Sequence, residues 1–520
     1  MRNRLKQSCE SRNCDSLFFC KKNWLHCQKS AVTIDRFYFS FDEKYDKIKN
    51  NTFLHKEVTH LLQQDTIAAL VTAVGESSVG IIRISGPEAV QIAAKIYKGK
   101  ADLQQAESHT IQYGYVYDWK QDKKIDEALF LLMRGPRSFT GEDVVEVQCH
   151  GGMVVLKQVL QLILLSGARL AEQGEYSKRA FLNGRLDLAQ AESIMDIVQA
   201  KTERGVDLAL SQLQGNLSGM VTGLRADLLE LIAFIQADID YPDDDIERLT
   251  PEQQEQRVTA LQQQIETVLQ SAQKGKMIRD GLRVVIAGKP NVGKSSLLNA
   301  LLGQERAIVT DIPGTTRDVI EEYINLNGIP LKIVDTAGIR ETDNLVEQIG
   351  VDKAQQFVKN ADLVLYVVDA VQGLTEQDTA MMTDIQGQPV IYLLNKSDIG
   401  GTEAVRQQLQ VVIGDKPVLD ISAREKTGLE QLEQTITDLF FAGTLEVSND
   451  ILVTNVRHIQ ILEECMAHLA GFLNGLQMGL SVDFLVIDLQ NAWEKLGKIT
   501  GETVEEDLLD QIFSKFCLGK

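Results

Sequence analysis

The segment G-K-P-N-V-G-K-S from Gly288 to Ser295 constrains the fold of this chain more than any other feature. It matches the pattern G-x-x-x-x-G-K-[ST] in full. The apolar run at 283–287 predicts a buried strand before it, and residues 296–302 predict a helix after it. In that context, backbone N–H groups of the loop and the helix N-terminus surround phosphate groups. The sequence therefore predicts a nucleotide site in which Lys294 reaches the terminal phosphates and Ser295 binds Mg²⁺.

Three later segments, each following or lying close to an expected strand, narrow the nucleotide to GTP. The D-T-A-G segment at 335–338 supplies a carboxylate for the Mg²⁺ shell and a glycine N–H for the γ-phosphate. In the N-K-S-D segment at 395–398, a carboxylate accepts from N1–H and the exocyclic amine of guanine, which adenine does not offer. Ser422 and Ala423 resemble the loop that backs the base. The expected GTP contacts are Asn291, Val292, Gly293, Lys294, Ser295, Ser296, Thr310, Asp311, Ile312, Pro313, Gly314, Thr315, Thr316, Asp335, Thr336, Ala337, Gly338, Asn395, Lys396, Asp398, Ser422 and Ala423.

The catalytic group is less easily predicted. Small signalling GTPases place a glutamine directly after D-x-x-G to position the attacking water, whereas this chain has Ile339. A polar group from elsewhere must therefore serve. The local candidates are Arg340, Glu341, Asp343 and Glu347, and the residues alone do not choose among them. The loop at 307–318 offers Thr316 to complete the Mg²⁺ shell.

The rest of the chain predicts a mixed α/β and α-helical protein. Short strands and helices alternate from Thr66 to about Ala180, and helical periodicity dominates 186–240 and the last 75 residues. The simplest architecture inserts the P-loop GTPase (Ras-like) G domain into a helical domain built from both flanks. The expected boundaries are 1–62 for an atypical extension, 63–180 for the α/β domain, 181–278 and 443–520 for the two helical parts, and 279–442 for the G domain.

The net charge of the chain limits how it can bind nucleic acid. The chain carries 53 Lys and Arg against 73 Asp and Glu, a net charge of −20. Such a chain does not bind a phosphate backbone over its whole surface, so a nucleic-acid role needs a local basic face or a basic partner. No apolar run is long enough to span a membrane. Seven cysteines, four of them within the first 27 residues, do not form a secreted disulfide framework.

The first sixty residues differ from the rest. They carry 12 Lys and Arg but 7 Asp and Glu, with no apolar segment typical of a secretory signal. A targeting segment, a disordered tail and a start codon placed too early all fit this composition. Because transit peptides are poor in acidic residues, we expect a cytoplasmic protein.

From about Asp65 to Lys520 the chain resembles the tRNA modification GTPase family MnmE, also called TrmE. The resemblance rests on the apolar residue after D-T-A-G and on four motifs. These are G-T-T-R-D at 314–318, G-I-I-R-I-S-G at 80–86, F-L-N-G-R-L-D-L-A-Q-A-E at 181–192 and F-C-L-G-K at 516–520. The resemblance implies GTP hydrolysis coupled to tRNA wobble-uridine C5 modification, the addition of an aminomethyl or carboxymethylaminomethyl group.

For the G domain, the resemblance implies dimerisation across the nucleotide faces when K⁺ is bound. Asn291 matches the family's K⁺-coordinating residue, and backbone oxygens of Thr310, Ile312 and Thr315 would complete the cage. Glu347 matches the water-positioning glutamate and acts with Lys294. Cys517 matches the terminal cysteine, which either serves the modification chemistry or packs.

For the N-terminal domain, the resemblance implies folate binding and dimerisation. Arg83, Glu146, Arg185 and Lys520 match positions that contact 5-formyl- or methylene-tetrahydrofolate, with cations for the glutamate tail and a carboxylate for the pterin N–H groups. One departure is Gly75–Val79, where the family often has a basic, glycine-rich turn.

The resemblance also implies partners. The family works as a homodimer with the FAD-dependent protein MnmG (GidA), in a heterotetramer or larger complex, and tRNA would bind mainly through that complex. A different function is a GTP-dependent assembly switch for ribosomes or membranes, since G-T-T-R-D loops also occur in ribosome-assembly GTPases. The folate-like module and Cys517–Lys520 favour the tRNA reaction. The GTP affinity and the amine donor, glycine or ammonium, stay open.

Overall fold

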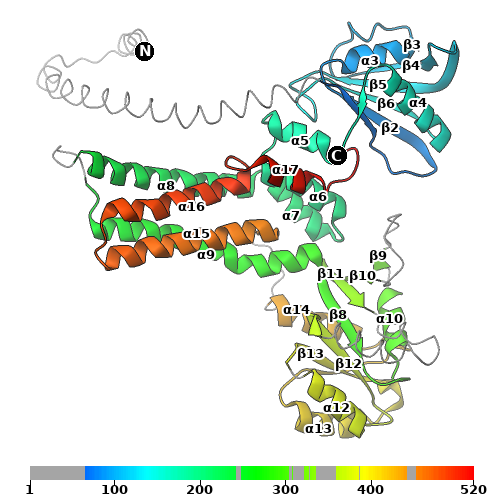
Figure 1. The fold of residues 1–520 in the computed structure, drawn as a ribbon. Coiled ribbons are helices and arrows are strands. Elements are labelled where there is room, and N and C mark those ends of the chain that lie inside the picture. The colour runs from blue at the N-terminus through cyan, green and yellow to red at the C-terminus, as the bar shows by residue number, and fades with distance from the viewer. Residues whose placement is uncertain are drawn as a thin grey trace, which may run out of the picture. The chain divides into compact units, whose positions relative to one another are not determined.

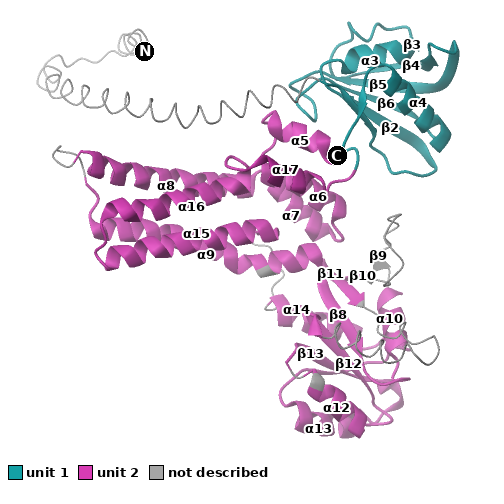
Figure 2. Cartoon of the chain, viewed as in Figure 1, with its two compact units in different colours: residues 1–172, 518–520 teal, residues 173–517 magenta. Residues whose placement is uncertain are grey.

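The computed structural model describes residues 65–241, 248–303, 307–308, 321–326, 328–334, 359–385, 387–441 and 452–520. The predicted extension at 1–62 lies outside these residues. The chain divides into two compact units, which Figure 2 colours separately. The first contains the chain up to Glu172 together with Leu518–Lys520, and the second contains Gln173–Cys517.

The first unit is a seven-stranded sheet with two helices on one face (Figure 1). The strand order is β3-β4-β5-β6-β2-β1-β7. Alternate residues of β2 and β6, such as Ile82 and Val147, form one core with Ile92 of α3 and Leu156 of α4. The strands are β1 (Ile67–Leu70), β2 (Ser77–Ser85), β3 (Tyr97–Gly99), β4 (Thr110–Asp118), β5 (Lys123–Met133), β6 (Val144–Gly151) and β7 (Arg169–Leu170), and the helices are α3 (Ala89–Ile96) and α4 (Met153–Leu165).

The last three residues of the chain pack on this sheet. Gly519 has a φ of +89°, and a Cβ atom there would lie 2.8 Å from the carbonyl oxygen of Leu70 and 2.9 Å from the Cα atom of Val71. Both the backbone conformation and the close approach to the end of β1 therefore require glycine.

Eight helices described in the second unit come from both flanks of the G domain. They are α5 (Glu175–Leu182), α6 (Leu188–Gln199), α7 (Glu203–Leu213), α8 (Asn216–Asp240), α9 (Pro251–Asp280), α15 (Val456–Gln477), α16 (Val482–Thr500) and α17 (Glu506–Phe513). Leu228 of α8, Leu261 of α9, Leu469 of α15 and Leu489 of α16 lie in one core, so residues far apart in sequence form a single bundle. Within the described ranges, no helix has both the length and the apolar composition needed to cross a membrane.

A buried charge cluster ties α6 to α15. Arg457 donates to both oxygens of Glu192, at 3.0 and 2.6 Å, and the His458 Nε2 atom lies 2.8 Å from Oε2 of Glu192. Burial alone would raise the pKa of Glu192, but His458 and Arg457 outweigh it and lower the pKa to about 2. The carboxylate is therefore charged at neutral pH and holds the two flanks together.

The G domain is a seven-stranded sheet in the order β14-β13-β12-β8-β11-β10-β9. Its strands are β8 (Leu282–Ala287), β9 (Ala307–Ile308), β10 (Glu321–Leu326), β11 (Ile329–Val334), β12 (Leu363–Asp369), β13 (Val390–Asn395) and β14 (Val418–Asp420). Strand β8 is parallel to β11 and β12, whereas β10 is antiparallel to β11. The sequence analysis missed β10, which returns through a tight turn at Gly328 with a φ of +90°.

Helices cover both faces of this sheet. They are α10 (Lys294–Leu302), α12 (Glu376–Asp384), α13 (Thr402–Ile413) and α14 (Leu429–Phe441), with a short 3₁₀ helix η2 (Ser397–Ile399). Val284 and Ile286 of β8 share a core with α10 and α14, while Val285 shares another core with α12 and α13. The structure thus confirms the predicted fold class, a P-loop G domain between two parts of a helical domain.

We expect Phe472→Ala, in the bundle core, to lower the free energy of unfolding of the second unit by about 3–5 kcal/mol, because a fully buried ring leaves a cavity. Thermal unfolding followed by circular dichroism measures the effect. The matched control is Phe484→Ala on α16, whose side chain is 69% exposed. Equal shifts in the melting temperature of the two variants would contradict the assigned core.

Candidate functional site

The loop between β8 and α10 has a conformation that depends on its glycines. Gly288 has a φ of +137°, and a Cβ atom there would lie 2.4 Å from the carbonyl oxygen of Val367. Gly293 has a φ of +101°, and its Cβ would lie 2.2 Å from Nδ2 of Asn395. Asn291 also has a positive φ, +64°. The loop therefore packs closely on its neighbours and can turn its backbone N–H groups to a phosphate chain.

The predicted phosphate-binding side chains lie at the start of α10. The Lys294 ammonium donates to the carbonyl oxygens of Gly288 and Lys289, at 3.0 and 2.6 Å, so its charge is held against the loop. Ser295 and Ser296 follow in the first helical turn and are exposed. A hydroxyl oxygen in this position is a ligand that Mg²⁺ accepts.

Asn395 joins the three described segments of the predicted guanine site. Its Nδ2 atom donates to the carbonyl oxygen of Val292 at 2.8 Å, and its Oδ1 atom accepts from the backbone N–H of Ala423 at 3.0 Å. The side chain is buried. Asp398 accepts a 2.6 Å hydrogen bond from the hydroxyl of Ser422. The structure therefore brings the phosphate loop, N-K-S-D and Ser422–Ala423 together.

The sequence analysis missed Asp369, which positions Lys396. The Lys396 ammonium lies 2.6 Å from Oδ2 of Asp369 and 3.4 Å from the carbonyl oxygen of Asn291. Burial would raise the pKa of Asp369, but hydrogen bonds from Lys396 and two backbone N–H groups outweigh it and lower the pKa. The sequence does contain a signal for Asp369, because it directly follows the apolar run 363–368. The carboxyl ends of parallel strands lie at one edge of a sheet, so a carboxylate at such an end is a candidate site residue.

The sequence analysis also missed Asp378, which forms an ion pair with Lys289 of the phosphate loop. The Lys289 ammonium lies 2.7 Å from Oδ2 of Asp378, which is fully buried at the start of α12, and it also donates to Thr375. Tyr366 donates to the other oxygen of Asp378 at 3.3 Å. Lys289 occupies one of the unspecified positions of the G-x-x-x-x-G-K-[ST] motif, so the motif does not predict its pairing with Asp378.

The remaining predicted nucleotide residues lie outside the described ranges. They are Thr310, Asp311, Ile312, Pro313, Gly314, Thr315, Thr316, Asp335, Thr336, Ala337 and Gly338. Glu347 and its three alternatives also lie outside them, so the choice among Arg340, Glu341, Asp343 and Glu347 stays a prediction.

In the first unit, Arg83 and Glu146 face each other across β2 and β6. Nε and Nη2 of Arg83 both lie 2.8 Å from Oε1 of Glu146, and the guanidinium stacks 5.0 Å from the ring centre of Phe139. Both side chains are 15% exposed. Because both bonds end on Oε1, the other carboxylate oxygen is available to accept from ligand N–H groups, which fits the expected folate contact.

The other predicted folate and cysteine positions are divided between the units. Lys520 belongs to the first unit, beside Gly519 at the end of β1. Arg185 belongs to the second unit, in the turn after α5, and Cys517 is an exposed free thiol at that unit's end. The buried cysteines Cys149 and Cys465 differ, because burial raises the pKa of each to about 12.

The sequence analysis also did not single out His150. It lies on the same face of β6 as Glu146, four residues earlier, because every second side chain of a strand points to the same face. Its Nδ1 atom lies 2.7 Å from Oδ1 of Asp126, and its backbone N–H donates to the other oxygen at 2.8 Å. The hydrogen bond to Asp126 raises the pKa of His150. This sheet face therefore carries a protonatable group besides Arg83 and Glu146.

The chain matches known proteins over nearly all its described length. The family models "MnmE helical domain" and "GTP-binding protein TrmE N-terminus" match residues 188–517 and 66–185. The chain is 48% identical over 462 residues to the tRNA modification GTPase MnmE of Bacillus subtilis, covering 88% of this chain and 100% of that protein. It is 49% identical to the Levilactobacillus brevis protein of the same name, covering 88% and 98%. The solved G domain of the T. maritima FeoB iron transporter is 30% identical, covering 30% of this chain and 97% of that one, with a TM-score of 0.24.

We expect Asp369→Asn to weaken guanine-nucleotide binding by about 10-fold or more, because a buried hydrogen bond to a charged group contributes about 1.5–3 kcal/mol. Titration with a fluorescent GDP analogue measures the change. The control is Asp420→Asn, which removes the half-exposed partner of Arg406 in the same sheet. Unchanged affinity in Asp369→Asn would show that this carboxylate does not position Lys396.

Proposed function

The chain belongs to the MnmE family of tRNA modification GTPases, and we therefore propose that it hydrolyses GTP as part of modifying C5 of the tRNA wobble uridine. One observation carries the proposal. Asn395 joins the phosphate loop, the N-K-S-D segment and the Ser422–Ala423 loop by hydrogen bonds, within a chain that matches that family over 88% of its length, and this supports a guanine-nucleotide site at these three segments.

In this proposal the described residues bind and orient GTP. Backbone N–H groups from Asn291 to Ser296 surround the phosphates, with the Lys294 ammonium moving from the loop carbonyls to the terminal phosphates. Asp398 accepts from the guanine N–H groups, while Asn395 and Lys396 hold the loops that enclose the base. Ser295 and Thr316 would hold Mg²⁺, which neutralises phosphate charge when bound.

We also propose the family's cation-dependent hydrolysis for this chain. Asn291, with backbone oxygens of Thr310, Ile312 and Thr315, would hold K⁺, which supplies the positive charge that an arginine finger supplies elsewhere. The exposure of Asn291 supports this, because a ligand can reach an exposed side-chain amide. Glu347 would orient the attacking water, since Ile339 cannot.

The first unit is proposed to bind a reduced folate, the 5-formyl or methylene form. Glu146 would accept from the pterin N–H groups, with Arg83 held against it, and Lys520 would bind the glutamate tail. Arg185 is the fourth proposed contact. We propose the domain limits 63–180 for the α/β domain, 181–278 and 443–520 for the two helical parts, and 279–442 for the G domain. For Cys517 we propose only that its exposed thiol is accessible to chemistry.

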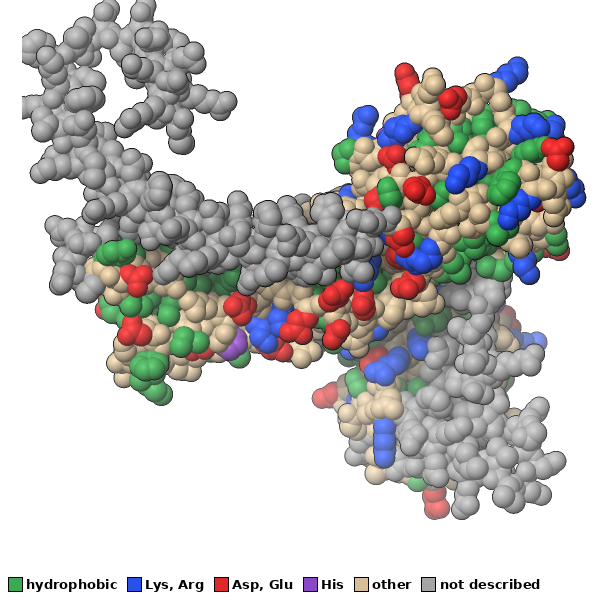
Figure 3. Space-filling model, turned by 45° about the horizontal axis from the view of Figure 1, so that its top comes forward, with side chains coloured by type: hydrophobic (Ala, Val, Ile, Leu, Met, Phe, Trp, Pro, Cys, Tyr) green, Lys and Arg blue, Asp and Glu red, His purple; other side chains and the backbone are tan. Residues whose placement is uncertain are grey.

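Partners follow from the same proposal. The chain would act as a homodimer with MnmG (GidA), in a heterotetramer or larger complex, and tRNA would bind mainly through that complex. The net charge of −20 supports this. On the face drawn in Figure 3, the basic side chains are interspersed with acidic ones, as expected if a partner supplies much of the basic surface.

We expect GTP turnover to be strongly faster in K⁺ than in Na⁺ at matched ionic strength. Glu347→Ala should bind GTP normally but hydrolyse it about 100-fold or more slowly, because it loses the group that orients water. Phosphate release assays measure both. The control is Asp343→Ala, a nearby carboxylate from the same segment. Equal rates in both salts together with an active Glu347→Ala would refute the proposed hydrolysis.

We expect Arg83→Gln to weaken binding of 5-formyltetrahydrofolate by about 10-fold or more, because a charge-assisted contact is lost. Isothermal titration calorimetry measures the affinity, and circular dichroism checks that the sheet still folds. The control is Lys157→Gln, which removes one positive charge from the exposed face of α4. If both variants bind folate like the wild type, the folate site lies elsewhere.

A further inference from the structure

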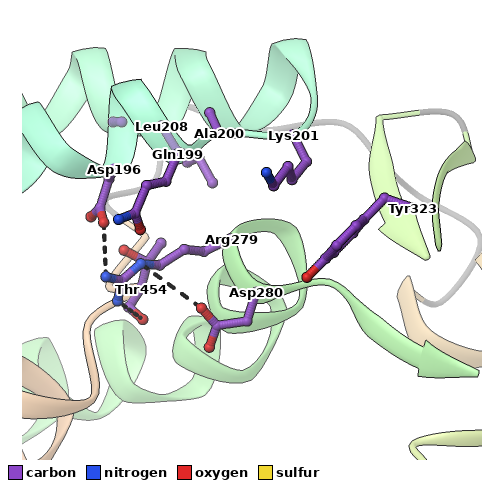
Figure 4. A pocket seen from close by; sticks show the side chains of 11 residues that line it. Asp196, Gln199, Ala200, Lys201, Leu208, Arg279, Asp280, Tyr323 and Thr454 are labelled. Atoms are coloured by element: carbon purple, nitrogen blue, oxygen red, sulfur yellow. Dashed lines mark hydrogen bonds and ion pairs between the residues drawn. The ribbon is translucent and has the colours of Figure 1, made fainter. Parts of the chain in front are cut away.

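The helical bundle adjoins the G domain at one of its two ends. There Arg279 of α9 pairs with Asp196 of α6 at 2.8 Å, beside a pocket of about 310 Å³ that Lys201 and Tyr323 also line (Figure 4). At the opposite end of the bundle, α15 turns back into α16 next to the end of α8 (Figure 1). Nothing in the proposed function uses this opposite end.

Helix α16 is apolar on two faces near this end. Leu485 and Leu489 lie on the face that is buried in the bundle core. Phe484 and Ile487 lie on another face, where their side chains are 69% and 50% exposed. Residues three apart are neighbours on a helix surface, so these two form a continuous stripe. The fold of the bundle needs only one apolar face of α16, and the second face is available to a partner.

The turn between α15 and α16 adds two apolar side chains in fixed positions. The backbone N–H of Leu480 donates to the carbonyl oxygen of Gly475 at 3.0 Å, and Gly479 has a φ of +69°. This is the Schellman arrangement, which closes a helix with a defined backbone conformation. Met478 and Leu480 are exposed in this turn, directly before the stripe on α16. We call these four side chains the α16 patch: Met478, Leu480, Phe484 and Ile487.

The surroundings of the α16 patch are acidic. The segments 234–241 and 476–490, at the end of α8 and around the turn into α16, contain four aspartates and no Lys or Arg. Arg248 pairs with Asp238 at 2.9 Å, so the carboxylates still outnumber the cations around the patch. On the face that Figure 3 draws, hydrophobic and acidic side chains lie together at this end of the bundle.

We propose that the α16 patch binds an amphipathic helix of a partner protein, with Lys or Arg at the margins of the apolar face of that helix. An exposed apolar stripe at helical spacing is the surface on which such a helix packs. Burial of Phe484 and Met478 would supply most of the affinity, while the basic side chains would pair with carboxylates such as Asp483.

The acidic surroundings argue against the other occupants of an apolar patch. A nucleic acid or an anionic membrane surface would meet these carboxylates as like charges. A second copy of the same patch would bring two acidic margins together, which is also repulsive. A cationic protein helix is the occupant that the charge favours. This inference rests neither on the tRNA reaction nor on the folate site.

Fluorescence anisotropy with a labelled peptide tests the proposal on the full chain at about 150 mM salt, where weak surface charge effects are screened. The probe is a leucine and lysine peptide of about 18 residues, with its leucines on one helical face. The comparison peptide has the same composition in a shuffled order without an apolar face. We expect the first to bind with a dissociation constant of about 10 μM or tighter, and the second at least about 10-fold more weakly.

A variant of the patch shows where the peptide binds. Phe484→Ser should weaken binding of the amphipathic peptide by about 10-fold or more, because it removes the largest side chain of the patch. The matched control is Val411→Ser on α13, which also removes a largely exposed apolar side chain and should leave binding unchanged. Ile487→Ser is expected to act like Phe484→Ser, and it decides alone if Phe484→Ser fails to fold.

Other results would overturn the proposal. Equal binding of the two peptides would show that charge alone attracts them, and equal binding by wild type and Phe484→Ser would place the peptide elsewhere. No binding by the wild type would mean that the patch accepts no such helix. Sedimentation equilibrium tests for a second copy, since a lower mass of Phe484→Ser than of wild type would show that two chains pair through the patch. None of these readouts depends on GTP turnover or folate binding, so they do not test the proposed function.

Discussion

The hydrogen bonds of the Asn395 side chain to the Val292 carbonyl and the Ala423 N–H are the contact on which the nucleotide site depends. They join loops that follow three different strands, so none of these loops can move without the others. Gly293 must be glycine because this amide occupies the space where a Cβ would be. Two ion pairs add to this. Asp369 pairs with Lys396 of the N-K-S-D segment, and Asp378 pairs with Lys289 of the phosphate loop. The phosphate loop is therefore fixed from three directions, as preorganised electrostatic stabilisation requires.

The helical bundle depends on a comparable arrangement in α6. Glu192 and Asp196 lie one turn apart, and each pairs with an arginine from a different segment, Arg457 of α15 and Arg279 of α9. Two carboxylates on adjacent turns repel, and the two differ in how far their partners compensate burial. His458 and Arg457 lower the pKa of Glu192 to about 2, whereas burial raises the pKa of Asp196 in spite of Arg279. Since α9 continues through Gly281 into β8, the same pair of turns contacts the C-terminal flank of the bundle and the entry to the G-domain sheet.

The sequence predicted the structure correctly where a motif, or a regular spacing of apolar residues, determines the local backbone conformation. The phosphate loop, the buried strands β8, β12 and β13, and the helical flanks follow from local spacing alone. It missed β10, the strand next to the edge strand β9, because a short run of mixed polar and apolar residues has no distinctive pattern. It missed Asp369, Asp378 and His150 as well. Their roles depend on partners distant in sequence, such as Lys396 and Lys289, and pairing of that kind is set by the tertiary fold rather than by local composition.

The position of Gly519 has a consequence for biosynthesis. Chains fold from the N-terminus as they leave the ribosome, and the sheet from β1 to β7 can form early. Its contact with Gly519 at Leu70 and Val71, and the neighbouring Lys520, become available only after the helical bundle and the G domain have been translated. During translation, the end of β1 in the first unit therefore lacks its contact with Gly519 until the last residues have been synthesised. A message truncated anywhere in the G domain would yield a first unit that lacks this contact.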